Sequence, residues 1–205
     1  MINEQSKELL NSFARIVREN VSDYSEVLTS EFYKDAVALV LEAQSKGGRV
    51  HVTGIGKPAH VANYAASLLS STGTPAYFLH GTEAVHGSCG QLVEGDVVIC
   101  ISNSGETSEM KSTVLAIKNN GCHIIGISGN PDSWLAKHAD VHLLAHVSRE
   151  GGPMNRAPIS SVIVECMVLQ GLGVVLQSNR KLTAQEYVKR HPGGALGRLR
   201  ENETK

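Results

Sequence analysis

The spacing of apolar side chains changes once along this chain. In the N-terminal part, apolar residues recur every three or four positions, which is the spacing of an amphipathic helix. A first helix is expected over residues 4–28, with Leu10 and Val17 on its apolar face, and a second from its cap at Ser30 to the stop at Gly47. The first helix precedes every predicted strand and has no sheet face reserved for it. It is therefore expected to pack either on another subunit or on its own domain.

From Arg49 onward, short apolar runs rich in β-branched residues alternate with helical patterns and glycine-containing turns. Such runs are typical of strands buried on both faces, and their alternation with helices implies right-handed βαβ units. The sequence thus predicts an α/β fold: a doubly wound, five-stranded, mainly parallel sheet flanked by helices. The strands are expected at 50–53, 76–79, 97–101, 122–127 and 141–144, and the helices at 59–71, 108–119, 133–138, 159–177 and 183–190.

Length and composition fit one domain. The 205 residues divide into N-terminal helices at 1–46, an α/β core at 49–178, and a C-terminal helix and segment at 183–205. The net charge is -1 and no long run of Lys or Arg is present, which argues against a nucleic-acid partner. The polar N-terminus does not resemble a targeting signal, and no apolar run reaches the roughly 20 residues of a membrane span. We expect a cytoplasmic protein with no membrane partner.

The turn after the third predicted strand carries the strongest functional pattern. The run Ser102-Asn103-Ser104-Gly105-Glu106-Thr107 directly follows a buried strand and opens the next helix. Free N–H groups at a helix start, the helix dipole and the hydroxyls of Ser102, Ser104 and Thr107 together form a cradle for a phosphate. The alternative is that these small polar residues only cap the helix.

A second turn, Gly54-Ile55-Gly56-Lys57, allows the backbone to approach a ligand and offers Lys57 to an anion. It lacks the third glycine of the dinucleotide fingerprint and the Lys-Ser/Thr ending of the nucleotide P-loop, so both motifs are excluded. A solvated lysine on a turn is the alternative. In doubly wound sheets, ligands bind beyond the carboxyl ends of the strands, where the turns 54–58, 80–90 and 102–109 would meet.

Histidine and glutamate supply the candidates for proton transfer. Of the nine histidines, His86 in the loop after the second strand and His191 before Pro192 are the functional candidates, and no metal site is expected. Glu150 follows the fifth strand and so emerges at the ligand end of the sheet. A carboxylate partly desolvated there would have the raised pKa that a general base needs. The alternative is an ordinary surface glutamate.

Four stretches that together span nearly the whole chain carry a family resemblance: 54–57, 71–75 leading to 83–87, 101–109, and His-Pro-Gly-Gly-Ala-Leu-Gly-Arg at 191–198. In this combination they resemble the sugar isomerase (SIS) domain family, and within it the arabinose 5-phosphate isomerase branch. The serine-rich turn is general to SIS domains, whereas the His86 loop and the 191–198 ending are specific to the branch.

The resemblance implies the SIS fold, a homotetramer, no cofactor, and interconversion of D-arabinose 5-phosphate with D-ribulose 5-phosphate through an enediol. The sugar phosphate would be the partner of the site. The residues expected to hold its phosphate are Gly56, Ser102, Asn103, Ser104 and Thr107.

The resemblance also suggests roles in catalysis. Glu150 would take the proton from carbon, Lys57 would stabilise negative oxygen in the enediol, and His191 would open the sugar ring, reaching in from a neighbouring subunit. Glu109 and His86 would assist as hydrogen-bond partners.

The sequence departs from the branch at three places. Pro58 stands where a serine usually follows the lysine, the loop 152–156 is bulkier and more polar, and Ile159 replaces a threonine. Since the chain ends soon after Arg198, the paired CBS domains of longer relatives are expected to be absent. Two alternatives therefore stay open: an isomerase of another phosphosugar, such as a hexulose 6-phosphate, and a sensor that binds a sugar phosphate without turning it over.

Overall fold

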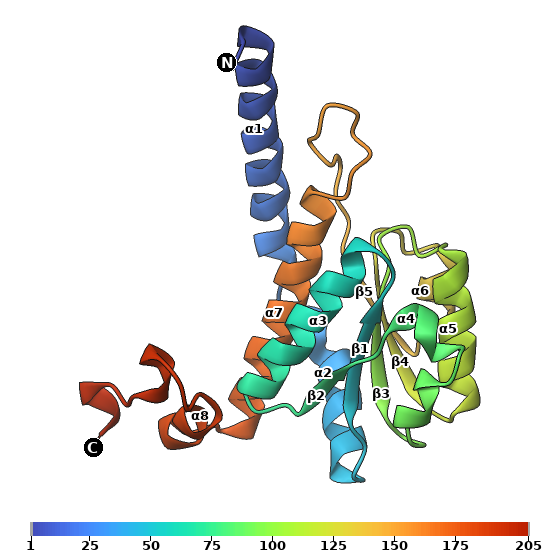
Figure 1. Cartoon of the computed structure of the whole chain (residues 1–205), viewed down its shortest axis with the longest axis vertical. Coiled ribbons are helices and arrows are strands. Elements are labelled where there is room, and N and C mark those ends of the chain that lie inside the picture. The colour runs from blue at the N-terminus through green and yellow to red at the C-terminus, as the bar shows by residue number, and fades with distance from the viewer. Residues whose placement is uncertain (1, 205) are drawn as a thin grey trace.

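The computed structural model of the chain describes residues 2–204. In this part of the chain the strands form one five-stranded sheet in the order β2-β1-β3-β4-β5, and every neighbouring pair is parallel. The predicted parallel α/β sheet is thus confirmed (Figure 1). The strands are β1 (Val50–Gly54), β2 (Ala76–Phe78), β3 (Val97–Ile101), β4 (His123–Ser128) and β5 (Val141–Leu144).

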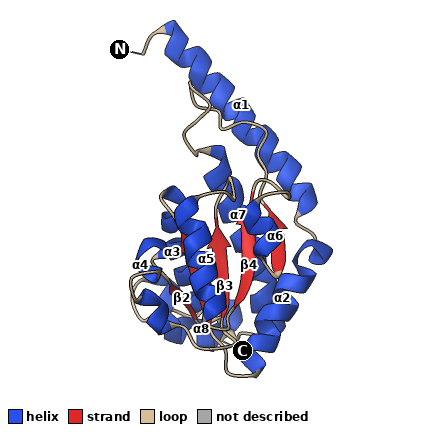
Figure 2. Ribbon diagram, turned by 90° about the vertical axis from the view of Figure 1, so that its right-hand side faces the viewer, coloured by secondary structure: helices blue, strands red, loops and turns tan. Residues whose placement is uncertain are grey.

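Helices cover the sheet on both faces (Figures 1 and 2). The helices are α1 (Glu4–Val27), α2 (Ser30–Ser45), α3 (Lys57–Ser71), α4 (Gly81–Ala84), α5 (Ser108–Asn119), α6 (Trp134–His138), α7 (Ser160–Arg180) and α8 (Ala184–Arg190). Alternate side chains of β3 divide the core in two, because successive residues of a strand point to opposite faces. Val97 and Ile99 pack with α2, α3 and α7, whereas Val98 and Cys100 pack with α5.

Helix α1 is partly packed on its own domain and partly free. Its C-terminal half buries Ile16, Asn20 and Tyr24. The Tyr24 hydroxyl donates to Leu144 O at 2.6 Å, which fastens α1 to the end of β5. The N-terminal half projects beyond the body of the molecule (Figures 1 and 2), and Leu10 there is 60% exposed. Packing on its own domain is therefore confirmed for the second half of α1.

Element boundaries differ from the predicted ones where a cap was misjudged. Thr29, and not Ser30, caps α2, because its side chain accepts the N–H of Phe32. Helix α3 starts two residues earlier than predicted, at Lys57, because Pro58 is tolerated in the first turn of a helix. The short helix α4 was not predicted. The predicted capping box of Thr183 and Glu186 is confirmed.

The expectation that no apolar run is long enough to span a membrane was wrong for α7. Within residues 2–204, this 21-residue helix is the one that meets the length and hydropathy of a span, and half of its apolar window is buried inside the protein. Helix α7 packs against α1, α2 and α3. Its composition therefore fits a helix in the protein core, which passes the same test of length and hydropathy.

At the amino ends of β1 and β3, a hydrogen-bond network is centred on the fully buried Asp96. Its carboxylate accepts the N–H groups of Arg49 at 2.7 Å and Val93 at 3.0 Å, and it also accepts from His51 Nε2 at 3.0 Å. Burial raises the pKa of Asp96, but the hydrogen bonds lower it by more, so the pKa lies below its usual value. This network ties the starts of the two central strands together.

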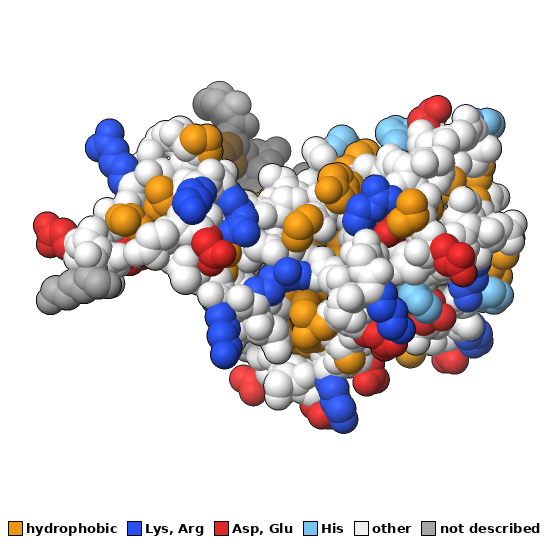
Figure 3. Space-filling view, turned by 90° about the horizontal axis from the view of Figure 1, so that it is seen from below, with side chains coloured by type: hydrophobic (Ala, Val, Ile, Leu, Met, Phe, Trp, Pro, Cys, Tyr) orange, Lys and Arg blue, Asp and Glu red, His pale blue; other side chains and the backbone are white. Residues whose placement is uncertain are grey.

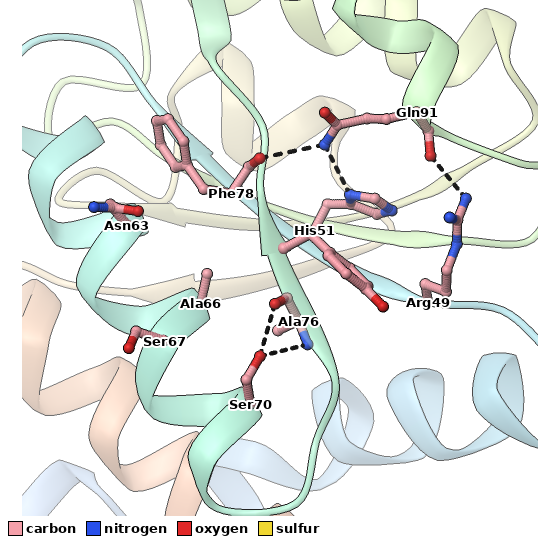
Figure 4. Close-up of a pocket in the computed structure, with 10 residues that line it drawn as sticks. Arg49, His51, Asn63, Ala66, Ser67, Ser70, Ala76, Phe78 and Gln91 are labelled. Atoms are coloured by element: carbon pink, nitrogen blue, oxygen red, sulfur yellow. Dashed lines mark hydrogen bonds between the residues drawn. The ribbon is translucent and has the colours of Figure 1, made fainter. Parts of the chain in front are cut away.

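The outer edge of β2 is covered by side chains, as Figure 4 shows. The Ser70 hydroxyl bridges the backbone N–H and C=O of Ala76, and the Gln91 amide donates to Phe78 O at 3.3 Å. These bonds satisfy edge groups that would otherwise invite another strand. The hollow of about 420 Å³ beside them has a mixed polar and apolar lining, and Ser70, Gln91, His51 and Arg49 in it already take part in hydrogen bonds.

Candidate functional site

The strand order places a crevice at the carboxyl ends of β1 and β3. Strand β1 connects to β2 on one side, and its neighbour β3 connects to β4 on the other side. The two connections therefore leave in opposite directions. Gly54, the last residue of β1, pairs in register with Ile101, the last residue of β3. The turn of Gly56 and Lys57 and the turn that begins at Ser102 therefore start side by side, as the sequence predicted.

The turn after β3 brings two of the predicted phosphate ligands together. Ser102 is buried, and its hydroxyl lies 3.2 Å from that of Thr107. Thr107 is the N-cap of α5, but its side chain makes no capping hydrogen bond. The hydroxyl of Ser104 instead accepts the N–H of Glu106 at 3.2 Å. The alternative that these residues only cap the helix thus receives no support from Thr107.

Glu109 shows that the start of α5 attracts negative charge. Its carboxylate accepts its own backbone N–H and the Ser108 hydroxyl, the latter at 2.8 Å, and these two bonds lower the pKa of Glu109. Uncapped N–H groups at a helix start bind anions because they have no partner within the helix. A phosphate and the Glu109 carboxylate would therefore compete for the same donors.

The turn 102–107 is held in place by the segment after β4. The N–H of Gly129 donates to Asn103 O at 2.8 Å, and the N–H of Leu135 donates to Gly105 O at 3.0 Å. Gly105 has φ +65, and a Cβ at this position would overlap the side chain of Ser133. Only glycine fits this contact, so the shape of the turn depends on it.

In the turn after β1, Gly56 has φ +67 and is the N-cap of α3, without a side-chain capping bond. Lys57 is the first residue of α3 and is exposed, so its ammonium is free to reach an anion at this edge. Pro58 has no N–H, which removes one donor from the helix start. Lys57 thus supplies the cationic group of the turn.

His86 comes from the loop after β2. Helix α4 in this loop is capped by His80, whose Nδ1 accepts the N–H of Glu83 at 3.3 Å. The Thr113 hydroxyl on α5 donates to Gly81 O at 2.6 Å, so the loop is held against α5. His86 follows α4 and is exposed. The structure therefore places the loop that carries His86 against α5, the helix of Glu109.

Glu150 is buried and caps α7. Its side chain is 8% exposed, and Oε2 accepts the N–H of Ile159 at 2.7 Å and of Ser161 at 3.1 Å. The backbone N–H of Glu150 in turn donates to Asn155 Oδ1 at 2.8 Å. Within residues 2–204, Oε1 makes no hydrogen bond. The alternative of an ordinary surface glutamate is therefore wrong, because the residue is buried and one of its carboxylate oxygens holds the start of α7.

His191 lies away from the other candidates. It ends α8, stacks on Tyr187 with 4.1 Å between ring centroids, and its Nδ1 lies 2.8 Å from Tyr187 O. Figure 1 shows α8 at the opposite end of α7 from the loop that holds Glu150. A helix of this length spans roughly 30 Å at 1.5 Å per residue. Within one chain, the structure does not bring His191 and Glu150 together.

Comparison with known proteins gives the family. The SIS domain model matches residues 43–174, which is more than half of the chain. The chain belongs to the SIS domain family. This SIS domain is 40% identical to arabinose 5-phosphate isomerase KdsD of Pseudomonas aeruginosa over 197 residues, 95% of this chain and 59% of that protein. KdsD of Escherichia coli K12 is 43% identical over 151 residues, 74% of this chain and 46% of that protein.

The SIS domain thus spans about half the length of the curated relatives it matches. A solved structure from Escherichia coli CFT073, in complex with arabinose 5-phosphate, has a TM-score of 0.81 and 34% identity. Its superposition covers 94% of this chain and 100% of that one. The resemblance found in the sequence motifs is confirmed at the level of family and fold.

One buried residue of this SIS domain was missed by sequence reasoning. Glu165 on α7 is 1% exposed, and neither carboxylate oxygen has a hydrogen-bond partner within residues 2–204. Burial, and then the nearby charge of Glu150, raise the pKa of Glu165 to about 8. A signal was available, because Glu165 is the single charged residue in the apolar run from Ser160 to Gln177.

Proposed function

We propose that this SIS domain is an aldose–ketose isomerase that interconverts D-arabinose 5-phosphate and D-ribulose 5-phosphate. The observation that carries the proposal is the meeting of the serine-rich turn and the Lys57 turn at the carboxyl ends of β1 and β3. The names of the relatives and the solved structure that holds arabinose 5-phosphate support the choice of substrate.

The phosphate would bind in the turn after β3. Ser102 and Thr107 would supply hydroxyls, Asn103 and Ser104 would line the turn, and the backbone at Gly56 would close the cradle from β1. The start of α5 supports this placement, because Thr107 makes no side-chain cap there and the N–H groups of a helix start are suited to bind an anion. The open-chain sugar would then extend toward Lys57 and Glu150.

The reaction needs one base that serves two neighbouring carbons. In the aldose, the base would take the proton from C2 while the C1 oxygen gains a proton, which gives the enediol. While it is held on the base this proton exchanges with solvent, and a proton is then delivered from the base to C1 while the C2 hydroxyl loses its proton and becomes the ketone. We assign the carbon proton to Glu150, whose Oε1 is free, and stabilisation of the negative oxygen to Lys57. His86 and Glu109 would be hydrogen-bond partners.

Ring opening is assigned to His191 of a neighbouring copy in a homotetramer. The separation of His191 from Glu150 along α7 supports this arrangement, since a single chain would lack one of the two groups. The exposed apolar residues Leu9 and Leu10 on the projecting half of α1 offer a contact surface for such an assembly. We place the reaction in the cytoplasm.

The test is incubation with D-ribulose 5-phosphate in deuterated water, followed by NMR. Arabinose 5-phosphate carrying carbon-bound deuterium is the expected product, because an enediol route exchanges the transferred proton with solvent. Glu150→Gln is expected to lower the rate by about 10²- to 10⁴-fold. Thermal stabilisation by the sugar phosphate without any turnover would contradict the proposal and favour a sensor.

A second candidate function is isomerisation of another phosphosugar. It is favoured by the altered loop 152–156 and by Ile159. The N–H of Ile159 donates to Glu150 Oε2, and Asn155 in the loop accepts the backbone N–H of Glu150. Turnover of a hexulose 6-phosphate, with pentose 5-phosphates unchanged in the same assay, would favour that candidate.

A further inference from the structure

Glu165 and Ser161 form a buried polar pair without partners. The Ser161 hydroxyl and both carboxylate oxygens of Glu165 are buried, and within residues 2–204 none of the three has a hydrogen-bond partner. A buried polar group without a partner is costly to the fold, and a buried unpaired charge is far more costly. Packing alone gives no reason to place a glutamate here.

Ser161 and Glu165 lie next to the carboxylate of Glu150. The N–H of Ser161 donates to Glu150 Oε2 at 3.1 Å. Glu165 is four residues further along α7 and so lies on the same face, one turn away. Side chains on a helix tilt toward its N-terminus, so the Glu165 carboxyl is directed toward Ser161 and Glu150.

Within residues 2–204, the buried side chains of α1, α2 and α3, the helices packed against α7, carry no charge. The buried side chains of α3 are all apolar, and on α1 they are Ile16, Asn20 and Tyr24. The hydroxyls of Tyr24 and of Tyr33 on α2 donate to backbone carbonyls, at 2.6 and 3.0 Å. Glu150 is therefore the charge that acts on Glu165, and it has the same sign.

We propose, on the basis of the proposed function, that Glu165 is a positioning residue that acts through Glu150. As a neutral acid, Glu165 keeps the two buried carboxyls of Glu150 and Glu165 at a single negative charge. Two carboxyls whose surroundings differ in this way divide the roles, one ionised and one protonated. Glu150 accepts two N–H groups and acts as the carboxylate, whereas Glu165 accepts none and holds its proton. A second negative charge in the pair would oppose the dianionic phosphate and the enediolate.

The test compares the pH profiles of isomerisation for the wild type, Glu165→Gln and the exposed control Glu8→Gln on α1. Wild type and the control are expected to lose activity above about pH 8, where Glu165 ionises. Glu165→Gln cannot ionise, so its alkaline limb should move up by about one pH unit or more, with a neutral-pH rate within about threefold of wild type. The same alkaline limb in all three proteins would overturn the proposal.

A second measurement separates this inference from the proposed function. The carboxyl carbons of labelled glutamate are followed by NMR in the wild type, with signals assigned from Glu165→Gln and Glu150→Gln. The Glu165 signal should be that of a protonated acid at pH 7, and the Glu150 signal should shift again as Glu165 titrates. If no sugar phosphate is turned over, the proposed function fails while this titration still decides the coupling. An ionised Glu165 at pH 7 would overturn the inference.

Discussion

At the scale of single residues, Asp96 is the buried charge on which the sheet depends. Removing one partner of a buried, hydrogen-bonded charge network leaves the remaining donors unsatisfied. We expect Asp96→Asn to lower the free energy of unfolding by about 3 kcal/mol. Urea denaturation at pH 7 measures this, with the exposed Asp132→Asn as the matched control. Equal midpoints for the two variants would contradict the role given to the network.

The lowered pKa of Asp96 also predicts an acid-sensitive fold. Because the folded state holds this carboxyl in its ionised form, the stabilisation is complete above the unfolded pKa of about 3.9 and is lost as pH falls through the lowered folded pKa. Asp96→Asn should lack this part of the acid dependence. Unfolding followed by circular dichroism between pH 2 and pH 7, chosen to span this window, shows whether the two curves converge at low pH.

Glu165 is expected to change stability with pH in the opposite direction to Asp96. Its folded pKa is raised to about 8, so the free energy of unfolding should fall as pH rises from the unfolded value to about 8, and then level off. Glu165→Gln removes this cost and is expected to stabilise the protein at pH 7 by roughly 3 kcal/mol. Thermal melts at pH 4 and pH 8 check the sign, since the gain should be small at the lower pH. A variant less stable than wild type at pH 8 would show that the carboxyl has a stabilising contact.

At the scale of elements, the turn between β3 and α5 is held in shape by its contact with Ser133. Gly105→Ala would combine a positive φ with an overlap of side chains, so we expect a loss of about 2 kcal/mol or more in stability and a weakened phosphate site. The measurement is the thermal shift produced by D-arabinose 5-phosphate. Gly90→Ala is the control, because a Cβ there meets nothing within 4 Å. An unchanged ligand response in Gly105→Ala would argue against this turn as the phosphate site.

Elements were predicted well where periodicity is local, and less well at their ends. The five strands and the helices α5 and α8 lie within a residue or so of the predicted bounds, because alternation and helical spacing are read over a few neighbours. Helix α4 was not predicted because its four residues are held by His80 and by Thr113 from another helix. No pattern within residues 81–84 indicates it.

At the scale of the whole molecule, the distance between Glu150 and His191 predicts complementation between subunits. Glu150→Gln and His191→Ala should each be inactive as pure proteins. When the two are co-expressed in equal amounts, about a quarter of the sites would combine an intact Glu150 with an intact His191 from the neighbour. The isomerase rate of the purified mixture measures this. A mixture as inactive as its parents would contradict a site shared between copies.

The surface charge of the whole molecule is close to neutral. Viewed from below, positive and negative side chains are interspersed over the molecule (Figure 3), in line with a net charge of -1. No extended basic face is visible on that side among the residues that the structure describes. Attraction of a sugar phosphate would therefore come from the local donors of the two turns and not from the overall field.

The sequence by itself determined the fold class, the strand positions and the turns that meet at the carboxyl edge of the sheet. These follow from periodicity and turn chemistry, which act between near neighbours and are visible in the chain. Tertiary structure alone decided that Glu150 is a buried helix cap, that Glu165 is left without a partner within residues 2–204, and that His191 lies at the far end of α7. Each of these depends on which distant segments exclude water from a side chain, and burial of that kind is set by the packing of the whole core.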